Sequence, residues 1–198
     1  MPQAINPLKI IRIVAWVLVA VIASAFLYLQ YAPNAPRGAV IGGPFTMTTM
    51  NGEKLDVGVA EKGKPYGVFF GFTQCPDVCP TTMFELSQTF KKMGTAVNNF
   101  RVYFVSVDPE RDTPQLLKDY LSAFDPRIIG MSGTADEVAA VAKAHRAFYR
   151  KVPTPSSYTM DHTAQVYLFD KTGDLFGTLD MQENEDARVK KLTRLLGK

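Results

Sequence analysis

Cys75 and Cys79 are the only two cysteines in the chain, and they lie four residues apart within the segment GFTQCPDVCP, residues 71–80. An apolar run, residues 68–70, leads into this segment, and a helical pattern, residues 81–97, follows it. Both thiols are therefore expected at a strand-to-helix junction, where free backbone N–H groups and the helix dipole favour thiolate over thiol. Because residues i and i+4 share one face of a helix, the sulfurs can meet a common partner. That partner is either the other sulfur, in a disulfide, or a soft metal ion.

A disulfide with a purely structural role is the weaker interpretation. The loop between Cys75 and Cys79 has only three intervening residues, so a bridge would restrict the unfolded chain very little. Redox chemistry and metal binding remain. Two thiolates are too few for zinc, which usually has four ligands, whereas Cu(I) accepts two soft ligands and is well served by three.

The chain has two histidines that could supply a third ligand. His162 directly precedes a predicted strand, residues 164–169, which in a thioredoxin-like sheet would neighbour the strand that feeds the cysteine loop. We therefore predict that His162 is a ligand, since a neutral imidazole suits copper, with Asp161 as an outer partner or a surface carboxylate. His145 falls within a predicted helix, residues 134–149, and is assigned to packing or to the surface.

Three other features have two interpretations each. Met160 is a soft thioether near His162, although methionines more often serve as packing. Asp77, between the cysteines, would raise a thiol pKa by its charge or offer an outer-sphere hydrogen bond. The polar loop DPERD, residues 108–112, is either a docking or supporting loop or a solvated turn.

The composition is that of a globular protein: 198 residues, 46% hydrophobic and 21% charged. Apart from Lys9 and Arg12, which precede an apolar N-terminal run, the basic and acidic side chains nearly balance. Nucleic-acid binding needs clustered lysine and arginine, so no nucleic-acid partner is expected.

The N-terminal run is uncharged over residues 13–29. A bilayer span needs about 20 apolar residues, with ~17 near the lower limit. Trp16, Tyr28 and Tyr31 lie toward its ends, as interfacial aromatic residues do, and Lys9 and Arg12 place the N-terminus in the cytoplasm by the positive-inside rule. A cleaved signal peptide is the alternative, but its apolar region is typically only about 7–15 residues long.

These signals predict three parts: residues 1–31, a cytoplasmic N-terminus and transmembrane anchor; residues 32–40, a proline-rich linker; and residues 41–198, the folded domain. No arginine- and serine-rich transit segment precedes the run. We therefore expect a single-pass protein of the bacterial inner membrane with its soluble domain in the periplasm.

The predicted elements of the folded domain alternate between strands and helices. They are a hairpin (45–48 and 54–57) around Asn51-Gly52, strands 66–72, 100–107 and 128–131, helices 81–97, 113–124 and 134–149, a loop 151–158, a hairpin of strands 164–169 and 175–179, and a helix 184–196. This order predicts an α/β, thioredoxin-like fold, a central mixed sheet flanked by helices. The cysteines lie at the carboxyl end of the first central strand, where open α/β sheets bind ligands.

With these residues identified, the chain resembles the Sco/SenC family of membrane-anchored copper-handling proteins that help to assemble cytochrome c oxidase. Three segments in the same order carry the resemblance: residues 68–82, 105–114 and 161–163. The resemblance implies that Cys75, Cys79 and His162 bind one copper ion, Cu(I) or Cu(II) or both. Gln74 departs from the histidine or tyrosine often found there, without adding or removing a ligand.

Two functions remain open. In the first, the protein is a copper chaperone and not an enzyme, which receives copper from an upstream periplasmic donor and delivers it to the dinuclear copper site of cytochrome c oxidase subunit II. In the second, Cys75 and Cys79 form the redox pair of a thiol–disulfide oxidoreductase that reduces the cysteines of that subunit. The C-x-x-x-C spacing, and Asp161-His162 in the place of a cis-proline, count against the second.

Overall fold

The computed structural model describes residues 7–31 and 40–197. Contacts divide the chain into two units, Met1–Ala39 and Val40–Lys198. All of the predicted linker except Val40 lies outside the described residues, as does the start of the predicted N-terminal part.

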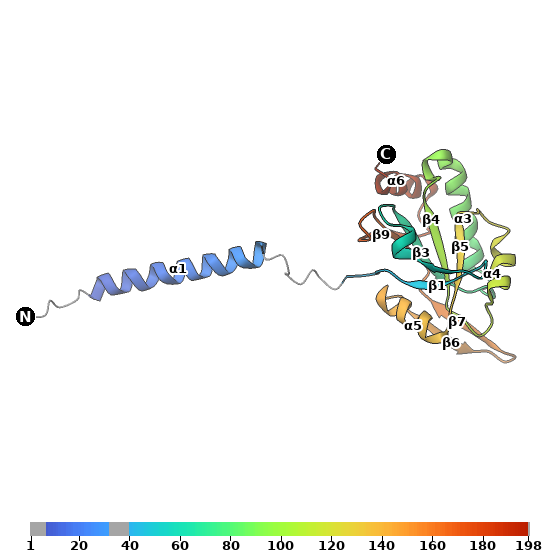
Figure 1. Cartoon of the computed structure of the whole chain (residues 1–198), viewed down its shortest axis with the longest axis horizontal. Helices are drawn as coiled ribbons and strands as arrows, with labels where there is room; N and C mark the ends of the chain where they lie inside the picture. The colour runs from blue at the N-terminus through green and yellow to red at the C-terminus, as the bar shows by residue number, and fades with distance from the viewer. Residues whose placement is uncertain (1–6, 32–39, 198) are drawn as a thin grey trace, which may run out of the picture. The chain divides into compact units, whose positions relative to one another are not determined.

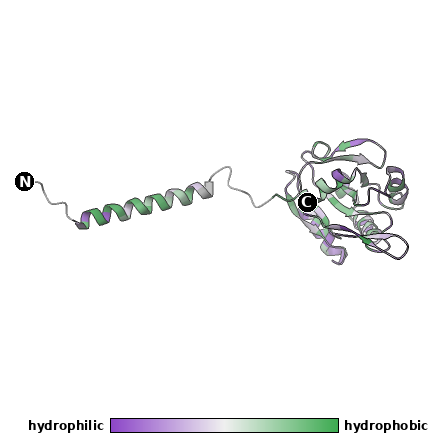
Figure 2. Ribbon diagram, turned by 90° about the horizontal axis from the view of Figure 1, so that it is seen from below, coloured by the Kyte–Doolittle hydropathy of each residue, from purple (hydrophilic) through white to green (hydrophobic). Residues whose placement is uncertain are grey.

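The first unit contains one helix, α1 (Pro7–Tyr31), which is long and apolar enough over Pro7–Tyr28 to cross a membrane. At 1.5 Å per residue these 22 residues extend about 33 Å, close to the ~30 Å hydrocarbon core of a bilayer. Figure 2 shows that most of the helix is hydrophobic, and large side chains such as Trp16 and Ile22 are exposed along it. A signal sequence would meet the same criterion, so the distinction between anchor and signal peptide stays a prediction.

The second unit contains the remaining elements, shown in Figure 1. In order they are β1 (Thr46–Thr49), β2 (Lys54–Asp56), α2 (Val57–Ala60), β3 (Tyr66–Gly71), α3 (Val78–Met93), the 3₁₀ helix η1 (Gly94–Val97), β4 (Arg101–Ser106), α4 (Pro114–Leu121), β5 (Ile128–Ser132), α5 (Ala135–Ala144), β6 (Tyr149–Pro153), β7 (Tyr158–His162), β8 (Val166–Phe169), β9 (Leu175–Leu179) and α6 (Glu185–Leu195).

Seven strands form one mixed sheet in the order β2-β1-β5-β4-β3-β8-β9. The central strands β3, β4 and β5 are parallel, and β1 and β8 pair antiparallel to them on either side. Connections between parallel strands need a crossover, which α3 and α4 supply here. The predicted thioredoxin-like fold is therefore confirmed.

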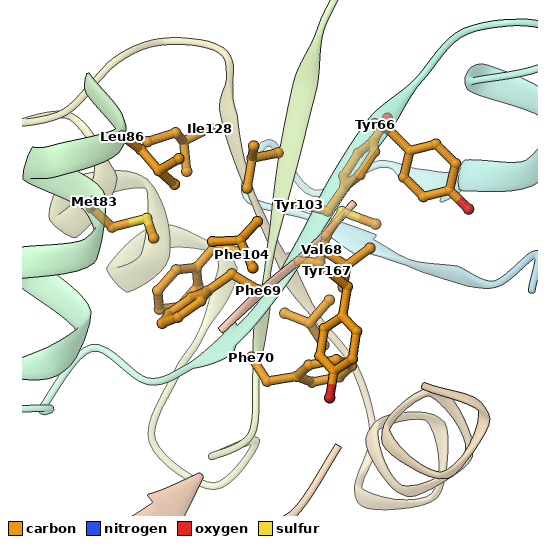
Figure 3. Close-up of a cluster of buried hydrophobic side chains, with 14 of the residues drawn as sticks. Tyr66, Val68, Phe69, Phe70, Met83, Leu86, Tyr103, Phe104, Ile128 and Tyr167 are labelled. Carbon is orange, nitrogen blue, oxygen red and sulfur yellow. The ribbon is translucent and has the colours of Figure 1, made fainter. Parts of the chain in front are cut away.

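The core surrounds β3, whose six residues are all buried. Successive side chains of a strand point to opposite faces of the sheet. On one face Phe69 packs against Phe104 of β4, with 5.7 Å between ring centroids, and Figure 3 shows Met83 and Leu86 of α3 on this side. This packing on α3 fixes where the connection from β3 to α3, which contains Cys75, must run.

The predicted helix 134–149 extends too far at its C-terminal end, and the predicted loop 151–158 is a loop only at residues 154–157. Helix α5 ends at Ala144, because Arg146 has a left-handed backbone angle (φ 52°) that turns the chain away from the helix axis. The segment that follows forms a hairpin of β6 and β7, a two-stranded sheet separate from the main one. The prolines and serines of this segment occupy the end of β6 and the turn. These residue types correctly indicate a turn, but they also make the adjoining strands look like part of a loop.

Helix boundaries differ elsewhere by a few residues. Helix α3 begins at Val78, so Cys79 lies in its first turn. It ends at Met93, because Gly94, the first residue of η1, has a positive φ of 55°. The predicted capping box of Thr134 and Glu137 is present at the start of α5, and Asn184 caps α6 as predicted.

Candidate metal centre

The two cysteines lie where β3 passes into α3. Cys75 is half-buried in the connection, and Cys79 is fully buried in the first turn of the helix. The backbone N–H of Cys79 donates to the Sγ atom of Cys75, 3.4 Å away. Cys75 thus accepts one of the N–H groups that have no partner within a helix. The prediction of thiols at a helix N-terminus is confirmed.

His162 is the last residue of β7, and its ring faces both sulfurs. Its Nε2 atom lies 3.4 Å from Sγ of Cys79 and 3.9 Å from Sγ of Cys75. Its Nδ1 atom donates to the carbonyl oxygen of Thr163, 3.0 Å away, since a carbonyl oxygen can only accept. That bond fixes the orientation of the ring and leaves Nε2 toward the sulfurs.

The ligand atoms of Cys75, Cys79 and His162 all lie within 4.8 Å of one another. Phe69 and Phe72 hold the imidazole edge-on, with ring centroids 5.9 and 5.8 Å from its own. Two sulfurs and one nitrogen form a soft donor set in a half-buried place. The three residues selected from the sequence are therefore brought together by three different elements: the β3–α3 connection, α3 and β7.

The site holds one thiolate and one thiol in the metal-free protein. The hydrogen bond from Cys79, helped by His162 and by the backbone N–H groups of Cys79 and Asp77, outweighs burial and lowers the pKa of Cys75 to about 3. The same bond to Cys75, together with burial, raises the pKa of Cys79 above its ordinary value. Burial alone would lower the pKa of His162, but the hydrogen bond to Cys75, the charge of Cys75 and the backbone hydrogen bonds to Thr163 and Phe70 together outweigh it and raise that pKa.

Alkylation of the metal-free protein by iodoacetamide should therefore depend little on pH between 5 and 8. Cys75 is already a thiolate over that whole range, whereas a thiol of ordinary pKa, ~8.5, would gain about tenfold in reactivity per pH unit. The rate is followed by mass spectrometry of the modified peptide. Cys79→Ser, which leaves Cys75 as the sole thiol, identifies the residue modified. A tenfold rise per pH unit would contradict the low pKa.

The other candidates are placed apart from the ligand cluster or beside it. His145 is fully buried, bonds through Nδ1 to the carbonyl oxygen of Val141 (2.8 Å) and packs against aromatic rings, so it belongs to the core. Asp161 is exposed and pairs with Arg150 (2.6 Å). Asp77 acts on Cys75 through its backbone N–H, while its carboxylate accepts from Thr81 (3.4 Å).

A hollow of about 380 Å³ opens beside the cluster. Its lining includes Cys75 and His162, with the largely buried Met160 in its wall. Val78 and Phe148 contribute apolar side chains to it and are 40% and 57% exposed. The hollow gives a second molecule access to the Cys75 sulfur, whereas Cys79 lies beneath it.

The loop 108–112 is not a solvated turn. Asp108 and Asp112 are each only 2% exposed, and Asp112 accepts hydrogen bonds from both the backbone N–H and the hydroxyl of Thr73 (3.0 and 2.6 Å). The loop therefore supports the cysteine segment. Sequence reasoning did not identify Thr73 as its partner, because the two lie 39 residues apart.

The fold and the cluster define a thioredoxin-like protein with a Cys-Cys-His donor set suited to a soft metal ion. A family model described as SCO1/SenC matches residues 33–197. The chain belongs to this family, as the resemblance predicted.

Relatives with printed names support this placement. The chain is 35% identical over 164 residues to "Protein SCO2, mitochondrial" of Saccharomyces cerevisiae, covering 80% of this chain and 54% of that protein. It is 38% identical over 146 residues to the human "Protein SCO1 homolog, mitochondrial", covering 70% and 48%. It thus spans about half the length of these curated relatives. A solved structure, Bradyrhizobium japonicum ScoI with copper bound, is 44% identical, with a TM-score of 0.73 over 78% of this chain and 99% of that one.

Proposed function

We propose that this protein is a membrane-anchored copper chaperone that binds one copper ion, its cargo, through Cys75, Cys79 and His162. The observation that carries the proposal is the convergence of two sulfurs and one imidazole nitrogen within 4.8 Å. Three soft donors suit Cu(I), whereas structural zinc sites usually have four ligands. Among the described residues this is the one cluster of its kind, and no fourth ligand belongs to it. The copper-bound ScoI structure supports the choice of metal.

A chaperone must also release its cargo, and the two sulfur ligands differ in their exposure in a way that would allow release. Cys75 borders the hollow, while Cys79 is completely buried. An incoming thiolate could therefore replace Cys75 first and leave copper held by Cys79 and His162 until a second ligand arrives. Such stepwise exchange avoids a free copper ion.

The recipient that we propose is the dinuclear copper site of cytochrome c oxidase subunit II, with an upstream periplasmic protein as copper donor. The SCO1/SenC family match supports this assignment. We further propose that α1 anchors the protein in the bacterial inner membrane with the domain in the periplasm. A membrane-impermeant maleimide added to intact spheroplasts should then label Cys75. Labelling only after lysis would show that the domain lies in the cytoplasm instead.

The first test is an anaerobic Cu(I) titration of the reduced full chain in detergent micelles, against a chromophoric Cu(I) chelator. One copper held per chain is expected, and its transfer to metal-free subunit II should follow on mixing. No binding in competition with the chelator would refute the chaperone. Binding without transfer would refute only the recipient.

Gly71, at the end of β3, should be unable to accept a side chain without moving the site. A Cβ there would lie 2.8 Å from Phe104 and 2.9 Å from Sγ of Cys79. Gly71→Ala is expected to lower the free energy of unfolding by about 1–3 kcal/mol, as overpacking does, and also to weaken Cu(I) binding. Gly130→Ala is the matched control. Gly130 lies in β5 of the same sheet, away from the cysteines, and its Cβ would lie 2.9 Å from Leu121 of α4. Urea unfolding and chelator competition measure both effects; an equal loss of copper affinity in the two variants would contradict the prediction.

One observation favours the thiol–disulfide alternative, namely the low pKa of Cys75. In that reaction the Cys75 thiolate attacks a target disulfide and releases one target thiol. Cys79 then attacks the mixed disulfide, releases the second thiol and leaves a Cys75–Cys79 disulfide, which an external reductant must reduce. The raised pKa and burial of Cys79 oppose the second step. Metal-free protein that reduces oxidised subunit II with multiple turnovers, in the presence of a dithiol reductant, would make the protein an enzyme; we expect no turnover beyond one.

A further inference from the structure

The hairpin of β6 and β7 brings His162 to the cysteines, yet it is not hydrogen-bonded into the main sheet. Its position must therefore come from side-chain contacts and from its own ends. The loop 108–112, which follows β4, supplies such contacts. Glu110 pairs with Lys151 of β6 (2.6 Å), and Asp108 accepts from the hydroxyl of Tyr158, the first residue of β7 (2.9 Å).

Arg111 joins this loop to both halves of the metal centre. Its Nη1 atom donates to Oε1 of Gln74 (2.9 Å), the residue before Cys75, and to the carbonyl oxygen of Tyr158 (3.1 Å). Its Nε atom donates to the carboxylate of Asp108. The guanidinium also lies over the Tyr158 ring, 3.7 Å from the centroid. One side chain thus bonds the cysteine segment and the strand that ends at His162.

The base of this arrangement is buried and hydrogen-bonded. Asp108 and Asp112 are both buried, and Asp112 accepts from the hydroxyl of Ser106 on β4 (2.6 Å) as well as from Thr73. The Nη2 atom of Arg111, by contrast, is buried without a hydrogen-bond partner among the residues that the structure describes. A buried N–H group without a hydrogen-bond partner is unfavourable for folding. Arg111 therefore keeps its position at an energetic cost, which its other contacts must offset.

We infer that Arg111 is a positioning residue that holds the β6–β7 hairpin against the cysteine segment and so keeps His162 in place as the third copper ligand. This rests on the proposed function. Without Arg111, the hairpin loses the bond from Nη1 to the carbonyl oxygen of Tyr158 and the stacking on the Tyr158 ring. Cys79 stays in the first turn of α3, and Cys75 keeps its bond from the Cys79 N–H. The site then loses its nitrogen donor while both sulfurs remain.

Four variants of the full chain in micelles test this by Cu(I) chelator competition: Arg111→Met, Arg127→Met, His162→Ala and the double variant Arg111→Met/His162→Ala. Arg127 is a matched control, because it pairs with a near neighbour, Asp125 (2.7 and 2.6 Å), lies over an aromatic ring, Phe90, and is similarly shielded from solvent. Arg111→Met should weaken copper binding about 10–100-fold, as the loss of an outer partner typically does, and Arg127→Met by less than about twofold.

The double variant separates positioning from a general effect on the fold. If Arg111 acts through His162, Arg111→Met should cause no further loss when His162 is already alanine. An equal loss in both backgrounds, or no loss in the first, would overturn the inference.

Hydrogen exchange of the copper-free protein gives a second measurement that does not depend on copper binding. Backbone amides of β7 should exchange at least about tenfold faster in Arg111→Met than in wild type or Arg127→Met. Unchanged exchange would overturn the inference even if copper binding were confirmed. Faster exchange in a protein that binds no copper would refute the proposed function and retain the hairpin contact. If Arg111→Met does not fold, Arg111→Lys takes its place, since lysine keeps the charge but cannot reach three acceptors in the same planar geometry.

Discussion

Replacing Cys79 with serine is expected to abolish competitive Cu(I) binding, with an affinity loss of at least ~1,000-fold, equivalent to about 4 kcal/mol. Cys79 lies at the bottom of the site, 3.4 Å from Nε2 of His162. The only other sulfur in the cluster belongs to Cys75, which is already a ligand, so the variant keeps one sulfur donor instead of two. Serine offers a hard oxygen that does not ionise at neutral pH, whereas Cu(I) requires soft donors.

The fold should survive this substitution. The serine hydroxyl is smaller than the thiol and can still donate to Cys75, so the thermal midpoint of the metal-free protein should move by only a few degrees, for about 1 kcal/mol. Chelator competition and thermal unfolding, measured on the same sample, separate the two effects. Cys75→Ser should lose copper equally. Copper binding of wild-type strength in either variant would show that the copper site lies elsewhere.

The ligands of this centre could be selected from the sequence because their signals are local. Two cysteines spaced for one helical face, after an apolar strand, define the thiols without any knowledge of the rest of the fold. His162 needed a topological argument, that the strand at residues 164–169 neighbours β3, and the pairing of β8 with β3 confirms that neighbourhood. The ring itself, however, comes from the end of β7, one element earlier in the chain.

The sequence left the supporting role of the loop 108–112 open, because that role depends on contacts between distant segments. The loop 108–112 consists mostly of charged residues, which usually indicate a solvated turn. Asp112 is buried because Thr73 lies beside it, and Arg111 is held because Tyr158 covers it. The β6–β7 hairpin was missed for a related reason. Its proline-containing turn is apparent from the sequence, whereas the pairing of Tyr149 with His162 requires that the helix end before Arg146, which the helical pattern over 134–149 does not indicate.

His162→Ala is expected to weaken Cu(I) binding by at least ~100-fold while the Cys75–Cys79 pair continues to form and release a disulfide. The loss should exceed the ~10–100-fold typical of outer partners, because a donor atom itself is removed. It should remain smaller than that of Cys79→Ser, since two thiolates alone still bind Cu(I) in a two-coordinate site. The order of the two affinity losses therefore reports how many ligands, and of which kind, remain on copper in each variant.

The control for His162→Ala is Asp161→Asn, which alters the preceding, exposed residue and its ion pair with Arg150 but no ligand. An exposed pair of this kind contributes little, so copper affinity should stay within about twofold of wild type. X-ray absorption of the copper-loaded proteins then gives the decisive comparison, because wild type and Asp161→Asn should show two sulfur neighbours and one nitrogen, and His162→Ala only the two sulfurs. A nitrogen neighbour that persists in His162→Ala would exclude His162 as the ligand and leave the chaperone with a different third donor.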